Sequence, residues 1–91
     1  GIFFPSGFTP DNNGRNDGFG PLGNLSSIRN FQLSIYNRWG ERVYFSNNPF
    51  NKWDGRVKGL ITDGNVFIWF SEFEIAGKPK ETRKGTLVLV R

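Results

Sequence analysis

The sequence predicts an all-β domain, a small Ig-like antiparallel β-sandwich of about seven strands. Short runs of alternating apolar and polar residues recur along the chain, and β-branched and aromatic residues concentrate in them. Glycine (12) and proline (5) interrupt the chain often, and no stretch keeps apolar residues at helical spacing. Because 91 residues can enclose one core only, we expect a single domain over residues 1–91.

The clearest strand covers residues 31–36, where Phe31, Leu33 and Ile35 share one face and Gln32, Ser34 and Tyr36 the other. The preceding stretch, residues 22–31, can hold one short helical turn at most. After the strand, Gly40 can take the positive φ of a tight turn, and alternation resumes at Val43 and Phe45. The pattern therefore predicts a β-hairpin.

Two further strands are predicted in the second half of the chain. One covers residues 66–75, between Gly64 and Gly77; its second face changes from apolar to acidic, so we expect the strand to leave the core or to bulge near Ser71. The other is the terminal run 84–91, KGTLVLVR, where both faces are apolar. This pattern is typical of a strand buried on both sides.

Composition argues against an enzyme. The chain has neither histidine nor cysteine, so the common triads, thiol nucleophiles and zinc sites cannot form. The net charge of +4 is spread along the chain and favours acidic surfaces only weakly, and we expect no nucleic-acid partner. No apolar run approaches the length of a membrane-spanning helix. The abrupt first residues, GIFFP, suggest a fragment of a longer protein.

The stretch FTPDNNGRNDGF, residues 8–19, offers Asp11, Asn13 and Asp17 as oxygen ligands for calcium. Calcium takes six to eight oxygens, however, and the fifth position of the loop is Arg15 with no acid following within reach. Asp and Asn side chains also bond their own backbone and tolerate left-handed geometry. A compact turn without an ion is therefore the favoured interpretation, and a calcium site is the alternative.

The hairpin turn NRWGERV also admits two interpretations. Arg38, Trp39 and Arg42 could form a cationic and aromatic patch for a partner or a nucleic acid. Alternatively, Trp39 could cap one end of the core, which the turn pattern favours. Similarly, Trp53 before Asp54 and Gly55 suits either a sugar-stacking site or, preferably, a buried indole under a turn.

Two acids, Glu72 and Glu74, share one strand face about 7 Å apart. Paired carboxylates occur in glycoside hydrolases, but a solvated strand face explains this pair better.

Five motifs, in this order, resemble the gliding motility-associated C-terminal domain of Bacteroidota, the type B sorting domain of the type IX secretion system. They are the loop at 8–19, FQLSIYNRWGERVYFS at 31–46, WDG at 53–55, DGNVFIW at 63–69 and KGTLVLVR at 84–91. The loop residues that carry the match are Phe8, Thr9, Pro10, Asp11, Asn13, Asn16 and Asp17. Asn13 stands where the family commonly has Asp, which weakens the calcium interpretation, and Phe67 and Trp69 stand where it often has Tyr.

The resemblance implies a non-catalytic sorting signal on a larger secreted or surface protein. We expect no cofactor, and calcium at Asp11, Asn13 and Asp17 is the alternative. The cargo would cross the periplasm and finish at the cell surface or outside the cell. The implied partner is the type IX machinery, in particular an outer-membrane protein of the PorP/SprF type. The alternative function is a calcium- or glycan-binding adhesin module.

A folded address must be recognised through its surface. Strand addition at a sheet edge is a general route, so the terminal strand, Leu87, Val88, Leu89, Val90 and Arg91, is the leading candidate for partner binding. The loop from Asp11 to Asp17 and the basic hairpin tip, Arg38 and Arg42, come next.

Overall fold

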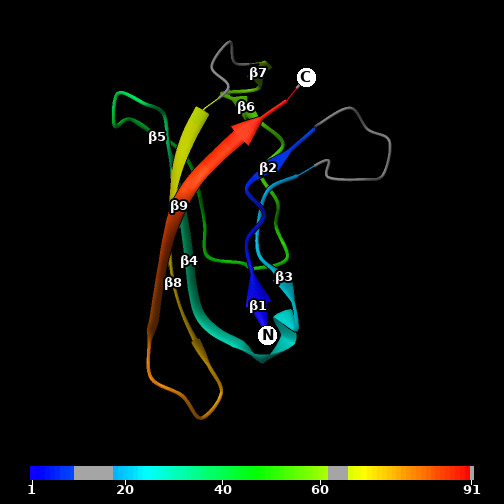
Figure 1. The fold of residues 1–91 in the computed structure, drawn as a ribbon, viewed down its shortest axis with the longest axis vertical. Helices are drawn as coiled ribbons and strands as arrows, with labels where there is room; N and C mark the ends of the chain where they lie inside the picture. Colours follow the sequence, from blue (N-terminus) through cyan, green and yellow to red (C-terminus); the bar gives the residue numbers. More distant parts are fainter. Residues whose placement is uncertain (10–17, 62–65, 91) are drawn as a thin grey trace.

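The computed structural model describes residues 1–9, 18–61 and 66–90 (Figure 1). These residues form strands and one short 3₁₀ helix, η1 (Leu25–Ser27), which agrees with the single helical turn expected there. No helix in these three ranges is long and apolar enough to cross a membrane. The strands are β1 (Ile2–Phe3), β2 (Gly7–Phe8), β3 (Leu22–Gly23), β4 (Ile28–Tyr36), β5 (Arg42–Ser46), β6 (Arg56–Val57), β7 (Leu60–Ile61), β8 (Val66–Ile75) and β9 (Glu81–Leu89).

One five-stranded sheet, in the order β2-β9-β8-β4-β5, forms the first layer. Its long strands are antiparallel, whereas β2 pairs with β9 in parallel, Gly7 opposite Val88 and Phe8 opposite Leu89. The second layer consists of two short ribbons, β1–β3 and β6–β7, with connecting chain that lies over one face of the sheet (Figure 1). A bridge between Phe19 and Trp53 joins this connecting chain. The predicted β-sandwich class is confirmed.

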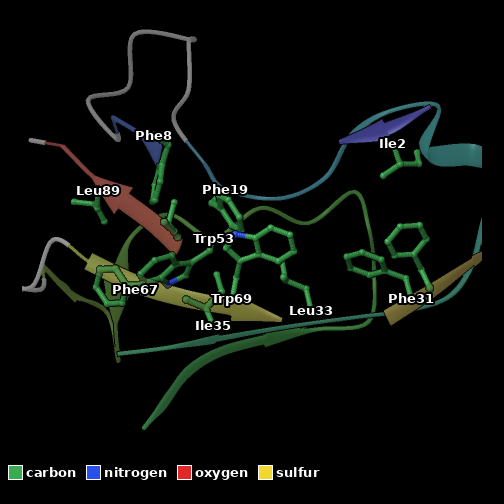
Figure 2. Packing of buried hydrophobic residues seen from close by; sticks show 12 residues of the cluster. Ile2, Phe8, Phe19, Phe31, Leu33, Ile35, Trp53, Phe67, Trp69 and Leu89 are labelled. Atoms are coloured by element: carbon green, nitrogen blue, oxygen red, sulfur yellow. The ribbon is translucent and has the colours of Figure 1, made fainter. Parts of the chain in front are cut away.

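The core fills the space between the two layers, as the period-two patterns predict (Figure 2). Trp53 meets Phe67 edge to face, with ring centroids 4.9 Å apart, and Phe4 stacks on Trp69 at 4.2 Å. Each such aromatic pair adds about 0.5–1.5 kcal/mol beyond the area it buries. The buried apolar residues are Ile2, Phe8, Phe19, Phe31, Leu33, Ile35, Trp53, Phe67, Trp69, Phe73, Leu87 and Leu89.

Strand β8 runs regularly through Ser71, so the bulge expected there is wrong. Pairing with β9 continues without a break from Val66 to Phe73. The irregularity lies in the neighbouring strand β4, between Arg29 and Gln32, where Asn30 has a positive φ of 52°. The buried Ser71 hydroxyl donates a 2.7 Å hydrogen bond to the Gln32 carbonyl beside this bulge. The acidic positions of β8 follow the solvent face of an unbroken strand.

The terminal strand is buried on one side only, which corrects the expectation of burial on both. Leu87 and Leu89 lie in the core, whereas Val88 and Val90 are 40% and 53% exposed. The second layer covers one face of the sheet, so the other apolar face of β9 meets solvent. Gly85 lies directly opposite Trp69 on β8, and the indole ring occupies the space that a side chain at position 85 would need.

Arg83 of β9 attaches the N-terminal segment to the sheet. Its guanidinium donates to the Ile2 carbonyl, pairs with Glu81, and lies 5.4 Å from the centre of the Phe73 ring. Further along, the Val88 amide donates to the Ser6 carbonyl at 3.0 Å. The first residues of the chain are therefore joined to its last strand at several points.

Candidate recognition surface at the hairpin end of the sheet

The terminal strand does not present a free edge at its last residues. Because β9 lies between β8 and β2, Val88 pairs with Val66 on one side and Gly7 on the other, and Leu89 pairs with Phe8. The amide of Val90 also donates to the Phe8 carbonyl at 3.0 Å. Strand addition at these positions would have to displace β2, so what remains accessible is the exposed side chains of Val88 and Val90. Arg91 lies outside the described residues.

The tip of the β4–β5 hairpin is organised by one side chain, Asn37. Its carboxamide oxygen accepts the backbone amides of Trp39 and Glu41 at 3.0 and 2.9 Å, and its Nδ2 donates to the Glu41 carboxylate at 3.1 Å. Two backbone bonds close the turn, from the Asn37 amide to the Glu41 carbonyl and from the Gly40 amide to the Asn37 carbonyl. Gly40 has φ of 86°, so the turn uses a glycine where its left-handed geometry is required.

This turn exposes Trp39 rather than burying it. The indole is 77% exposed, the largest value among the large apolar side chains of the described residues, and the expectation that it caps the core is wrong. Burying this ring would require the hairpin to fold back, whereas the Asn37 bonds hold the tip extended beyond the sheet (Figure 1). Arg38 lies over the ring, with its guanidinium carbon 4.9 Å from the ring centre.

Arg42 connects the tip to the sheet. Its guanidinium carbon lies 5.0 Å from the centre of the Phe45 ring, and the residue pairs with Tyr36 across the hairpin. Neither Arg38 nor Arg42 makes an ion pair with any other described residue. The tip therefore presents two cations, an aromatic ring and the Glu41 carboxylate that Asn37 holds. It lies at the same end of the sheet as the end of β9, because β4 and β9 both finish where β8 begins (Figure 1).

The loop that resembles the family motif begins in the core. Phe8 is 3% exposed and Thr9 is half-buried, while Phe19 at the far end is fully buried. Pro10, Asp11, Asn13, Asn16 and Asp17 lie outside the described residues, so a calcium site there stays a prediction. In the described ranges no three acids come together in a way that could hold a metal ion.

The preferred interpretation of Trp53 is confirmed. The side chain is 1% exposed, and its Nε1 donates to the Arg56 carbonyl at 2.9 Å. Asp54 accepts the Arg56 amide at 2.9 Å, which closes the turn around the indole. The ring is therefore not accessible for stacking on a sugar.

Glu72 and Glu74 lie on the solvent face of the sheet, as the non-catalytic interpretation expects. Glu72 stands between Gln32 and Thr82 on the neighbouring strands, and Glu74 pairs with Arg29 in register. The Asn30 carboxamide donates to Glu74 at 3.2 Å. Both acids have polar cross-strand neighbours.

Among the described residues, burial shifts the pKa of two ionisable groups, Tyr44 and Lys52. Burial raises the pKa of Tyr44 above its ordinary value of 10.0, and Asp54 adds to this, while a hydrogen bond with Ser46 opposes it. Burial lowers the pKa of Lys52, whose ammonium donates to the Pro21 carbonyl. The methylenes of this lysine lie against Gly18 and Gly20, where a Cβ would collide with them. Lys52 therefore holds its own connecting segment against the segment that contains Gly18, Gly20 and Pro21.

The domain is a small β-sandwich with an exposed aromatic and cationic tip, and the acids of its described residues are dispersed. These features define a class of domain that is recognised through its surface. The family described as CHU_C type IX secretion signal domain matches residues 2–89. The chain belongs to this family, as the resemblance in its motifs implied, and it has the role of a C-terminal sorting signal for type IX secretion. Domains of this family are in general non-catalytic, and the role implies export and contact with the secretion machinery. No curated protein and no solved structure gives a significant match.

Proposed function

We propose that the domain is read in its folded form by an outer-membrane protein of the PorP/SprF type, and that the hairpin tip is central to this contact. The domain itself catalyses no reaction and binds no nucleic acid. Its cargo passes through the periplasm and finishes at the cell surface or in the medium. Membership in the secretion signal family supports the export route.

The observation that carries the proposal is the exposure of Trp39 on an ordered turn. Trp and Arg are the residues most enriched among the energetic hot spots of protein interfaces. An exposed indole on a mobile loop would lose conformational entropy on binding, whereas the Asn37 bonds fix this tip in advance. Arg38 over this ring and Arg42 over Phe45 favour a partner surface that carries acidic groups.

The test is a secretion assay in a bacterium that uses the type IX system. Residues 1–91 are fused behind an exported fluorescent protein, and reporter in the periplasm, on the surface and in the medium is measured. We expect export to require the PorP/SprF-type protein. Trp39→Ala should lower export several-fold, whereas Phe50→Ala should leave it unchanged, because Phe50 is also exposed (63%) but lies outside the hairpin. Full export of the Trp39→Ala reporter would contradict the role of the hairpin tip. Full export without the PorP/SprF-type protein would contradict its assignment as the partner.

Calcium binding by Asp11, Asn13 and Asp17 is a separate proposal with its own measurement. A ligand that binds only the folded chain raises its melting temperature by mass action. On the favoured interpretation, a turn without an ion, calcium leaves the melting temperature of the wild-type chain unchanged. A rise in the wild-type chain that Asp11→Ala abolishes would instead support the calcium alternative, and either result leaves the sorting role intact.

A further inference from the structure

The solvent face of the five-stranded sheet carries a continuous apolar area at the hairpin end. In the register of the sheet, Val66 lies beside Val88, and Ile68 beside Tyr36 and Thr86. The next row runs Phe45, Ser34, Phe70, Lys84 across four strands. We call the outer apolar patch the set of Phe45, Val66, Ile68, Phe70 and Val88.

Each member of the outer apolar patch is between 38% and 49% exposed. Together they present on the order of 400 Å² of apolar surface, within the range of the largest patches on monomeric proteins, which are often functional. The second layer of the fold lies over the opposite face of the sheet, so no described element covers this one (Figure 1). The patch is therefore contiguous and accessible in the isolated domain.

Charge at the patch is positive on two sides. Arg42 lies over Phe45 at one margin, and Lys84 stands opposite Phe70 at the other. Neither cation makes an ion pair within the described part of the chain. Among the described residues of β8, the first acid on this face is Glu72, which lies one row further from the hairpin and has Gln32 and Thr82 as its neighbours. A complementary surface would therefore have an apolar centre and acidic groups at its rim.

The size and charge of the patch disfavour a second copy of this chain as the occupant. A standard interface buries about 800 Å² on each partner, and obligate homodimers bury more and are more apolar. The patch supplies about half of that. Stacking two copies about a two-fold axis would also bring Arg42 and Lys84 of one copy near cations of the other. These features suit a transient contact with a different protein.

We propose that the outer apolar patch docks, together with the hairpin tip, on a surface of the PorP/SprF-type protein that has an apolar centre and an acidic rim. This inference rests on the proposed function and extends it from the tip to a sheet face. Arg42 joins the two regions, since it follows the tip and lies against Phe45. The exposed Val88 places part of the terminal strand in the same contact.

The test measures binding of the 91-residue chain to the purified PorP/SprF-type protein in detergent, alongside the reporter assay. The double variant Ile68→Thr/Phe70→Thr keeps strand-compatible residues and removes the centre of the patch. Its control, Phe50→Thr, removes an even more exposed aromatic ring (63%) outside the sheet. For charge, Lys84→Glu is compared with Lys80→Glu, which makes the same change before β9 begins, at the other end of the sheet. Melting temperatures establish that each variant folds.

We expect the double variant to weaken binding by about tenfold or more, as truncation at an interface centre does. Lys84→Glu should weaken binding and reduce its salt dependence, while Lys80→Glu and Phe50→Thr bind as the wild type does. If a folded double variant binds with wild-type affinity, the outer apolar patch is not part of the contact. The proposed partner is then retained, provided that reporter export still needs the membrane protein. No binding by the wild-type chain would overturn the assigned occupant, and partner-independent export would show that the proposed function had failed with it. Dimerisation of the chain that the double variant abolishes would assign the patch to a second copy.

Discussion

Replacing Gly85 with alanine tests how the terminal strand packs under the core. A Cβ added at this position would lie 2.9 Å from Nε1 of Trp69 and 3.1 Å from two carbons of the same ring. The indole cannot move away easily, because Phe4 stacks on it at 4.2 Å and Phe19 lies 5.9 Å from it. Glycine is therefore required here by close approach of a ring rather than by backbone angle.

Two opposing effects set the size of the change. Alanine in a strand is favoured over glycine by about 0.5–1 kcal/mol, because it restricts the unfolded chain more. Forcing extra volume into a packed core costs about 1–3 kcal/mol. Steric cost should win, and we expect Gly85→Ala to lower the free energy of unfolding by about 1–2 kcal/mol. For a domain of this size that corresponds to a melting temperature roughly 5–15 °C lower.

The assay is urea and thermal unfolding followed by circular dichroism, arranged as a double-mutant cycle with Trp69→Phe. The smaller ring frees space, so Gly85→Ala should cost less in the Trp69→Phe background than in the wild type. A Gly85→Ala protein as stable as the wild type, or a strictly additive cycle, would refute the packing described for β9.

Three further predictions concern the tip, the core and titration. Asn37→Ala removes three hydrogen bonds of the tip, so the amides of Trp39 and Glu41 should exchange hydrogen about tenfold faster, with little change in overall melting; unchanged exchange would mean that the backbone alone orders the turn. Trp53→Phe leaves a cavity and an unpaired Arg56 carbonyl, and should cost about 2–3 kcal/mol in urea unfolding; a loss within error of zero would contradict the burial of this indole. Because burial raises the Tyr44 pKa in the folded chain, its contribution to stability is complete below pH 10.0 and is lost as the pH rises through the folded-state pKa. The stability difference between the wild type and Tyr44→Phe should therefore shrink or reverse above that pH, and a difference independent of pH would contradict the shift.

The faces of the long strands could be predicted from the sequence. Phe31, Leu33 and Ile35 alternate with polar residues, and all three are buried, because successive side chains of a strand must point to opposite sides. The burial of Trp53 was predictable for a similar local reason, since the Asp54 turn directly follows it. Where covalent geometry or a short-range turn decides, the sequence pattern is sufficient.

The exposure of Trp39 could not be predicted in the same way. The residue falls in a regular turn pattern, and its direction depends on which backbone amides the Asn37 side chain accepts. Likewise, both faces of the strand from Val66 to Phe70 are apolar, and only the placement of the short second layer decides which face meets solvent. That double-sided pattern was the available signal for the outer apolar patch.

The edge positions depended on contacts between distant parts of the chain. The parallel pairing of β2 with β9 joins the two ends of the chain, and no local sequence pattern indicates it. This pairing covers the edge that was expected to be free at the terminal strand. The bulge was placed on the wrong strand for a related reason, since Asn30 with its positive φ absorbs the shift instead of Ser71.

The parallel pairing of Phe8 with Leu89 has a consequence for the timing of biosynthesis. On the ribosome, β2 emerges early and has no neighbour in the large sheet until β9 has been translated and released from the exit tunnel. Contacts of such high sequence separation form slowly. A chain interrupted before β9 would lack the partner of β2 and one of the two neighbours of β8. Only a chain translated through the whole domain can therefore present the folded sorting signal.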